Sequence, residues 1–470
     1  MSNFDEIQTR EAGLHKKLTA KQMTMIAIGG AIGTGLFMGS KFAIGFAGPG
    51  VILSYAIGGL IAFALMVCLA EMTVQHPTSG SFGAYAEHYI HPMAGFVVRY
   101  CYWAAIVLAV GTEITAVADY MKLWYPDVAS WIWIGLFSFL LFAVNAFSVK
   151  AFGVVEYWFS TIKVFAIVVF IILAIGILTQ QQNGTQQISH NLTAYGGFFP
   201  NGFKGVWMAV IISIFSYLSI EMIAVAAGEA QDPETAVVKA LKSTALRLIL
   251  FYLISLFLII CLVPWPELIR PGATSPFVTV MQYIGIPFAD SILNFIVIVA
   301  ALSAMNSMLY ISTRMLFSLS RAGDAPQLFG RIRSNGVPIN ALMVSALGIA
   351  IASVVYAVNP ESAFPIMIAL SMFGVLITWG SIFLTHMFFR AKMAKTQTPI
   401  KFKVPLSNLI SVFGLISMLS ILITTWFTDE FKSTLSFGLP FLLLIFIMYF
   451  VKKLFPKSTD VSQSQDQLSD

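Results

Sequence analysis

The sequence predicts an all-α integral membrane protein with twelve transmembrane helices. Of its 470 residues, 58% are hydrophobic and only 10% are charged, whereas an ordinary soluble domain carries about 25% charged residues. This composition excludes a soluble enzyme, a disordered chain and a secreted disulfide scaffold. A helix needs about 20 apolar residues to span a bilayer, and twelve apolar segments come close to or exceed that length: 23–43, 50–70, 94–118, 129–148, 158–178, 205–227, 243–263, 288–312, 339–358, 363–388, 405–427 and 436–451. Because these runs are continuous, they exclude the short alternating strands of a membrane barrel.

Basic residues predict the orientation of this bundle. If both termini are cytoplasmic, 20 of the 27 Lys and Arg residues fall in cytoplasmic segments and five fall in outer loops. Cytoplasmic loops of membrane proteins carry such an excess of Lys and Arg. We therefore expect a multi-pass protein of the plasma (inner cell) membrane with its N- and C-termini in the cytoplasm.

Two of the predicted spans differ from plain membrane helices. The first contains GGAIGTG at 29–35, and each glycine inside a helix costs about 1 kcal/mol relative to alanine. The sixth places Ser213, Ser216 and Ser219 shortly before Glu221. Close packing of helices through small residues explains scattered glycines, but it explains this dense run poorly. Interrupted helices at matching positions of two five-helix halves are typical of a transport site.

Peptide groups at such a break can bind charged groups without any buried side-chain charge. The amides around Gly33, Thr34 and Gly35 begin the second half of the first span, where free N–H groups suit a carboxylate. Free carbonyls at a break suit an ammonium group.

Three ionisable residues, Glu113, Lys163 and Glu221, lie inside predicted spans. Each costs about 2.5–3.5 kcal/mol at the bilayer centre, so we expect them to act in coupling or gating. The alternative is mutual structural pairing or snorkelling, and that alternative fits Arg99 best. Glu71, Glu87 and Glu156 lie closer to the interfaces, and we expect them to be structural or gating charges on the cytoplasmic side.

Nine motifs, in order along the first 340 residues, carry a resemblance to a known family. The chain resembles the amino acid permeases of the amino acid–polyamine–organocation superfamily, and in particular the bacterial amino acid transporter family. The motifs are GGAIGTGLFMGS (29–40), AGPG (47–50), LAEM (69–72), SGSFGAYAEHYI (79–90), VKAFGVVEYWFSTIKV (149–164), AAGEAQDPE (226–234), SPF (275–277), ALSAMNSMLYISTRMLFSLSRAGDAP (301–326) and NGVP (335–338).

The resemblance implies a LeuT-like fold with two inverted five-helix repeats, discontinuous helices 1 and 6, and two peripheral helices. On this basis residues 1–22 form a cytoplasmic segment, 23–390 the ten-helix transport core, 391–451 the two peripheral helices and 452–470 a cytoplasmic tail. The chain departs from the family in two places. Arg99-Tyr100 stands where the family usually has Gly-Trp, and Ser219 stands where it usually has glycine.

The resemblance also implies roles for individual residues. The carbonyls of Ala31, Phe215, Ser216 and Leu218 would receive the amino group, and Phe215 would cover the substrate. Ser219 would face the pocket and limit side-chain volume. Lys163 would lie between spans one and eight, close to Ser303 and to carbonyls near Gly29 and Gly30, and its charge would replace the sodium ion of related transporters.

These features favour a secondary-active permease that imports an amino acid by proton symport and alternating access. Two alternatives stay open, an exchanger with the same pocket and a sensor that binds amino acids without transport. Tyr102, Tyr217, Ser219 and Ser303 favour a neutral substrate. The sequence contains no P-loop, HExxH or CxxC motif, so we expect no enzyme activity, cofactor, metal or nucleic acid. The expected partners are the amino acid, a proton and membrane lipid.

Overall fold

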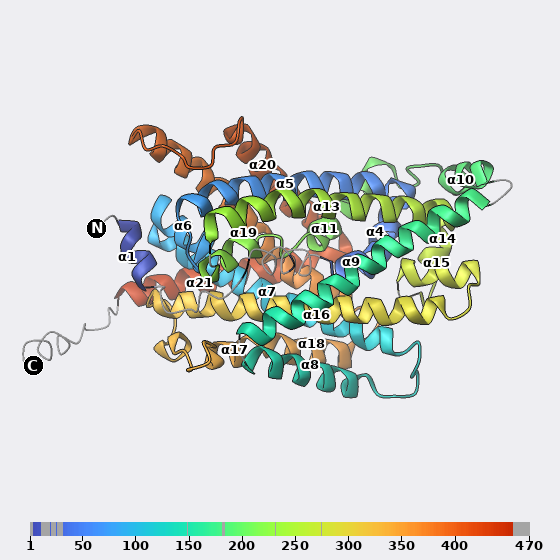
Figure 1. Cartoon of the computed structure of the whole chain (residues 1–470), viewed down its shortest axis with the longest axis horizontal. Coiled ribbons are helices and arrows are strands. Elements are labelled where there is room, and N and C mark those ends of the chain that lie inside the picture. Colours follow the sequence, from blue (N-terminus) through green and yellow to red (C-terminus); the bar gives the residue numbers. More distant parts are fainter. Residues whose placement is uncertain are drawn as a thin grey trace, which may run out of the picture.

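The computed structural model describes residues 3–10, 19, 25, 32–147, 149–180, 184–230, 232–273 and 275–454. Over these ranges every regular element is a helix, and the long helices run side by side in an elongated bundle (Figure 1). A helix pairs its own backbone N–H and C=O groups, which is why long apolar sequences adopt it in lipid. The predicted all-α class is confirmed.

Each predicted segment overlaps a helix, although some helices extend a segment by up to ten residues and several short helices lie outside all of the segments. They are α1 (Asn3–Arg10), α3 (Thr34–Phe37), α4 (Gly39–Ala47), α5 (Val51–Gln75), α6 (Ser81–Tyr89), α7 (Pro92–Met121), α8 (Ser130–Phe147), α9 (Val149–Gln180), α10 (Gly184–Thr193), α11 (Gly202–Ser216), α12 (Met222–Ala226), α13 (Pro233–Leu262), α14 (Trp265–Leu268), α15 (Pro276–Ile284), α16 (Ala289–Arg321), α17 (Ile339–Ser345), α18 (Leu347–Val358), α19 (Ala363–Lys395), α20 (Ser407–Trp426) and α21 (Lys432–Leu454), with short 3-10 turns at Gly48–Gly50, Ala227–Glu229, Gln327–Gly330 and Asp429–Phe431.

Nine helical stretches of the described residues are long and apolar enough to cross a membrane. The first, Thr34–Gln75, contains α3, α4 and α5 together, so it covers parts of two predicted spans. Gly202–Ser216 and Ile249–Leu262 are apolar but shorter. The chain is therefore a multi-pass membrane protein.

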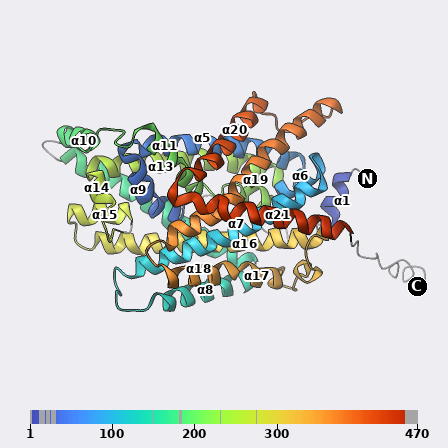
Figure 2. The same ribbon diagram turned by 180° about the vertical axis from the view of Figure 1, so that it is seen from behind.

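The centre of the bundle is formed by α7, α16 and α19. Helices α16 and α19 both pack along α7, and α5 packs against α13. Helices α8, α17 and α18 lie together on one flank in both views (Figures 1 and 2). Most of α8, α20 and α21 remains exposed although these helices are apolar, as expected for helices that face lipid acyl chains.

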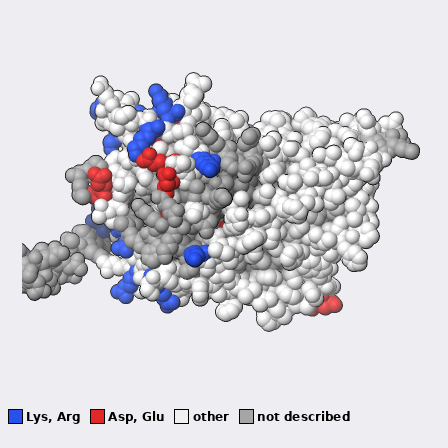
Figure 3. Space-filling model, viewed as in Figure 1, with Lys and Arg blue, Asp and Glu red and all other residues white. Residues whose placement is uncertain are grey.

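The two ends of the bundle differ in charge. Helix α1 lies at one end, which we call the α1 end, and α10, α14 and α15 lie at the other, which we call the α14 end (Figures 1 and 2). On the face drawn in Figure 3, Lys and Arg gather towards the α1 end, and the remainder of that face is almost free of charge. This distribution agrees with the orientation that the sequence predicts.

Candidate functional site

The described part of the first span bends just before α3, and we call this bend the first break. Ile32 and Gly33 form a bend, and Gly33 is extended, with φ −133° and ψ −154°. Two ionisable side chains bind the peptide groups at this break. The Lys163 Nζ atom donates to the Ile32 carbonyl at 2.9 Å, and a Glu113 carboxylate oxygen accepts from the Thr34 N–H at 3.2 Å. Both side chains are buried, so each replaces a partner that water supplies elsewhere.

Neighbouring atoms leave no room for a side chain at Gly33 or at Gly35. A Cβ atom at Gly33 would lie 2.7 Å from the Ala304 Cβ and 2.9 Å from a Glu113 oxygen. A Cβ atom at Gly35 would lie 2.6 Å from the Ser216 Cα. The first span therefore touches the sixth span directly at Gly35, backbone against backbone.

The sixth span is interrupted between α11 and α12, over residues 217–221. Ser219 there has a positive φ of 79°, a conformation that glycine adopts without the steric cost met by other residues. One Glu221 carboxylate oxygen accepts from the Ser219 N–H at 3.2 Å and from the Tyr102 hydroxyl at 2.6 Å. Glu221 therefore stabilises the break of its own span and ties that break to α7.

Tyrosines connect the two interrupted spans. The Tyr55 hydroxyl donates to the Gly35 carbonyl at 3.2 Å and lies 2.9 Å from the Ser216 Oγ atom. The Tyr252 hydroxyl donates to the Ser216 carbonyl at 2.9 Å. Sequence reasoning missed both tyrosines, because no motif marks a hydroxyl that becomes a partner only after α5 and α13 pack together.

Glu156 forms a buried polar cluster beside the first break. Its carboxylate accepts from Ser303 at 2.5 Å, from Ser160 at 3.1 Å and from Asn306 at 3.0 Å. Sequence reasoning expects Glu156 near an interface and misses this cluster; the side chain is completely buried. The spacing of Glu156, Ser160 and Lys163 at i, i+4 and i+7 was the available signal, since it puts all three on one face of α9.

The predicted site residues are distributed as follows. Gly33, Thr34 and Gly35 meet Glu113 and Lys163 at the first break, while Phe215, Ser216, Leu218, Ser219 and Glu221 are buried together at the second. Ser303 lies beside the first break through Glu156. Ala31, Gly29 and Gly30 lie outside the described residues. The Ser219 Oγ atom is buried and has no hydrogen-bond partner among the described residues, so it is available to a bound molecule.

The family model for amino acid permeases matches residues 22–465. The chain belongs to the amino acid permease family. It is 39% identical to the aromatic amino acid transport protein AroP of Escherichia coli (strain K12), over 88% of this chain and 90% of AroP. It is 38% identical to a protein of Bacillus subtilis (strain 168) named "Probable threonine/serine transporter YbxG", over 93% of this chain and 95% of that protein. The resemblance read from the sequence motifs is confirmed.

The fold of this permease is similar to that of a solved transporter. The crystal structure of the manganese transporter of Eremococcus coleocola matches with a TM-score of 0.60, over 93% of this chain and 94% of that one, at 12% identity. At so low an identity the match shows the fold alone. Among the described residues, no group of three or more His, Cys, Asp and Glu side chains is placed to hold a metal ion.

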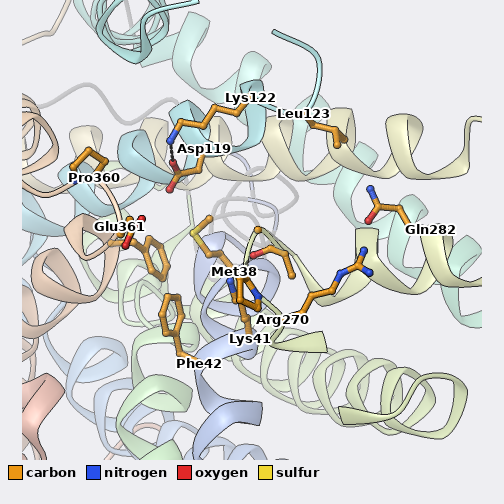
Figure 4. A pocket seen from close by; sticks show the side chains of 14 residues that line it. Met38, Lys41, Phe42, Asp119, Lys122, Leu123, Arg270, Gln282, Pro360 and Glu361 are labelled. Atoms are coloured by element: carbon orange, nitrogen blue, oxygen red, sulfur yellow. Dashed lines mark hydrogen bonds and ion pairs between the residues drawn. The ribbon is translucent and has the colours of Figure 1, made fainter. Parts of the chain in front are cut away.

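An outer cavity of about 640 Å³ opens at the α14 end of the permease (Figure 4). Met38, on the turn between α3 and α4, contributes to its lining. The Met38 N–H donates to the Thr34 carbonyl at 2.7 Å, so the cavity begins one helical turn from the first break.

At the α1 end of the permease, buried ion pairs connect several helices. Arg99 is fully buried, and it donates to Glu87 at 2.8 Å and to the Ser318 hydroxyl at 3.0 Å. Glu87 also accepts two hydrogen bonds from Arg10 of α1, at 2.8 and 2.5 Å. Burial acts to raise the pKa of the Glu87 carboxyl, but the guanidinium groups of Arg10 and Arg99 outweigh it and hold that pKa below its ordinary value. Arg99 is therefore paired, and it connects α1, α6, α7 and α16.

A second buried pair lies in the same half of α16. The Arg314 Nε atom donates to Glu229 at 2.8 Å, and the Tyr310 hydroxyl donates to the same oxygen at 2.7 Å. The Arg314 guanidinium lies 3.8 Å from the centre of the Tyr310 ring. These contacts bind the segment that follows α12 to α16, so the sixth span is fixed on the α1 side of its break.

Helix α1 is docked on this end through an aromatic contact. The Phe4 ring is buried, with its centre 4.2 Å from that of His76 and 5.3 Å from that of His88. Burial lowers the pKa of His76 to about 4, with the neighbouring His88 and Lys392 adding to the effect. Burial and Lys392 likewise lower the pKa of His88 to about 4. Both histidines are therefore neutral at physiological pH while α1 is docked.

Substitution of Gly35 tests the contact between the two interrupted spans. We expect Gly35→Val to abolish uptake in proteoliposomes, because the added side chain meets the backbone of Ser216, and overpacking of this kind costs about 1–3 kcal/mol. Expression should remain near that of the wild type. Gly45→Ala in α4 is the matched control, since its new Cβ would meet no atom closer than 3.9 Å. Normal uptake by Gly35→Val would exclude a role for this contact.

Acidification should release α1. The pKa of both histidines is depressed when α1 is docked, so the undocked state binds more protons, given an ordinary histidine pKa of about 6.5. Docking is therefore fully stable above about pH 6.5 and weakens as the pH falls from there towards 4. Amide hydrogen exchange of residues 3–10, corrected for the intrinsic exchange rate, measures the stability of α1 docking between pH 8 and pH 5. In His88→Gln, the protection of α1 should depend less on pH. Equal protection at both pH values would contradict the assignment.

Proposed function

We propose that this permease imports an amino acid across the plasma membrane by proton symport and alternating access. The observation that carries the proposal is the pair of ionisable side chains at the first helix break. Lys163 binds the Ile32 carbonyl and Glu113 binds the Thr34 N–H, on either side of Gly33. A change of charge on either group alters its hydrogen bond to the break, which links protonation to the conformation of the site.

The proposed binding site uses the peptide groups of both breaks. The N–H groups at Gly33, Thr34 and Gly35 receive the carboxylate of the amino acid, and the carbonyls of Ala31, Phe215, Ser216 and Leu218 receive its ammonium group. Because the Thr34 N–H donates to Glu113 here, the substrate carboxylate takes the place of Glu113 at that N–H. Phe215 covers the bound molecule. The Tyr252 hydroxyl already occupies one side of the Ser216 carbonyl, but a carbonyl oxygen has two lone pairs and can accept a second donor.

The proposed coupling acts through Lys163. Its ammonium group supplies the positive charge beside the first break, with Glu113 and Glu156 as neighbouring carboxylates. Glu156 in turn holds Ser303 of α16. Protonated Lys163 favours the outward-facing state that binds substrate, and release of the proton to the cytoplasm relaxes that state. Glu221 acts as a conformational element, since it connects the second break to Tyr102 of α7.

The proposed architecture is a LeuT-like arrangement with twelve helices. Residues 23–390 form two inverted five-helix repeats, in which α3 and α4 follow the break of the first helix and α11 and α12 lie on either side of the break of the sixth, and 391–451 form two peripheral helices. Residues 1–22 and 452–470 are cytoplasmic. The α1 end therefore faces the cytoplasm, in agreement with its basic residues, and the outer cavity faces outwards.

We propose a neutral substrate. The names of the two relatives described above mention aromatic amino acids and threonine or serine, whose side chains are uncharged, and a third relative of Bacillus subtilis (strain 168) is named "Putative histidine permease". Tyr217 and Ser219 beside the second break also favour an uncharged side chain. Competition of all twenty standard amino acids and 4-aminobutyrate for uptake would identify the substrate.

Lys163→Ala tests the proton coupling. In proteoliposomes, we expect wild-type uptake to be independent of sodium and to rise as the external pH falls. Accumulation driven by the pH gradient should fall at least about tenfold in Lys163→Ala, which corresponds to about 1.4 kcal/mol, while exchange against internal substrate continues.

Lys150→Ala is the matched control, because Lys150 lies on the same helix and is exposed. Sodium-dependent uptake, or unchanged accumulation in Lys163→Ala, would overturn the coupling. Wild-type flux that needs internal substrate would identify an exchanger, and binding without flux a sensor.

Ser219→Gly tests the limit on substrate size. Removal of the hydroxymethyl group should widen the competition profile towards bulkier amino acids. The glycine should also stabilise the protein by about 1 kcal/mol, because Ser219 has a positive φ. Ser219→Ala keeps the Cβ atom and separates loss of the hydroxyl from loss of volume. An identical ranking of competitors in wild type and Ser219→Gly would exclude Ser219 from the pocket.

A further inference from the structure

The outer cavity has charged side chains of both signs in its walls. Lys41 of α4 and Arg270, after α14, contribute cationic groups, while Asp119 of α7 and Glu361, before α19, contribute carboxylates. In Figure 4 the two carboxylates lie on one side of the cavity and Lys41 and Arg270 on the other. The four residues come from four different parts of the chain, so only the folded bundle brings them together.

Three of these charges are held loosely enough to meet a ligand, whereas Asp119 is already paired with Lys122, which also lines the cavity. The Lys41 Nζ atom donates to the Ala273 carbonyl at 2.5 Å, which orients an ammonium group but leaves its charge unpaired by that bond. Arg270 has an exposed ion pair with Glu267 at 3.9 Å, and pairs of this kind contribute little. Asp119 accepts from Lys122 at 2.9 Å and from Tyr356 at 2.7 Å. Glu361 is exposed, and none of the hydrogen bonds and ion pairs of the described residues involves it.

Apolar side chains complete the cavity. Met38, Phe42, Leu123 and Phe364 also line it, and the rings of Phe42 and Phe364 are stacked with their centres 5.7 Å apart. The Phe37 ring, on the turn before Met38, packs against the Phe277 ring, with the ring centres 4.8 Å apart. The cavity therefore lies outside the central site and is separated from it by one turn of the first span.

We propose that this cavity is a second binding site, which captures the free zwitterion of an amino acid before it enters the central site. The carboxylate of the ligand meets Lys41 and Arg270, its ammonium group meets Asp119 and Glu361, and its side chain lies against Phe42 and Phe364. The inference rests on the proposed transport of amino acids. It differs from the central site because it recognises both charges through side chains, whereas the central site uses peptide groups.

The exposure of these side chains sets the character of the site. Exposed charges interact weakly and are screened by salt, so the outer site binds in the millimolar range and loses affinity at high ionic strength. Such a site raises the local concentration of substrate next to the central site, and this increases the rate at which substrate binds to the central site. Its loss is therefore expected to raise KM and to leave kcat unchanged.

Ligand-observed NMR on Gly35→Val measures the outer site by itself. Saturation transfer should detect L-phenylalanine on this variant, and detect phenethylamine and 3-phenylpropionate, which each carry only one of the two charges, much more weakly. Arg270→Gln or Glu361→Gln in the Gly35→Val background should abolish the signal, whereas Lys204→Gln, on the outer face away from the cavity, should preserve it. Absence of a signal on Gly35→Val would overturn the proposal. Equal signals from 3-phenylpropionate and phenylalanine would identify a simple anion site and would overturn it as well.

Uptake by otherwise wild-type protein provides the second test. Arg270→Gln and Glu361→Gln should each raise KM by about two- to fivefold at low salt, with kcat unchanged, and the difference should vanish at about 1 M salt, where the screening length is only about 3 Å. Lys204→Gln should behave as wild type. Unchanged KM in both cavity variants would overturn the outer site while leaving transport intact. Absence of uptake by the wild type would instead refute the proposed function.

Discussion

An interrupted helix inside a membrane leaves peptide groups that no water can satisfy, and the other features of the permease depend on how these groups are paired. At the first break the partners are the side chains of Lys163 and Glu113. Neutral partners would satisfy the same peptide groups at lower cost, because a buried ionisable group must be desolvated. Two ionisable partners place these hydrogen bonds under the control of charge, as the proposed proton coupling requires.

The second break is stabilised in a different way. There the Tyr252 hydroxyl donates to the Ser216 carbonyl, and Glu221, which is held by the Tyr102 hydroxyl, accepts from the Ser219 N–H. Ser219 adds a strained conformation with a positive φ. The hydroxyl group at this break keeps the same charge near neutral pH, and Glu221 is the ionisable partner. The two spans are nevertheless in direct contact, because Gly35 lies against the backbone of Ser216.

Features that depend on neighbours in the sequence could be predicted, and features that depend on packing could not. The glycine run of the first span and the isolated charges Glu113, Lys163 and Glu221 stand out in an apolar sequence, and the structure brings Glu113 and Lys163 to the first break. The contact of Glu156 with Ser303 joins residues 147 positions apart. Nothing local to α9 or α16 distinguishes that pairing from an interface charge, because it is decided by how the two helices pack.

The two ends of the bundle hold their charges in opposite ways, and this contrast bears on the transport cycle. At the α1 end, Arg99 and Arg314 are buried against Glu87 and Glu229. Removal of one partner from such a pair costs about 3–5 kcal/mol, because the remaining charge stays buried. Opening of this end would instead return both charges of each pair to water, which offsets much of the lost attraction. Buried pairs are therefore compatible with an end that opens, provided that each pair separates as a whole and water enters with it.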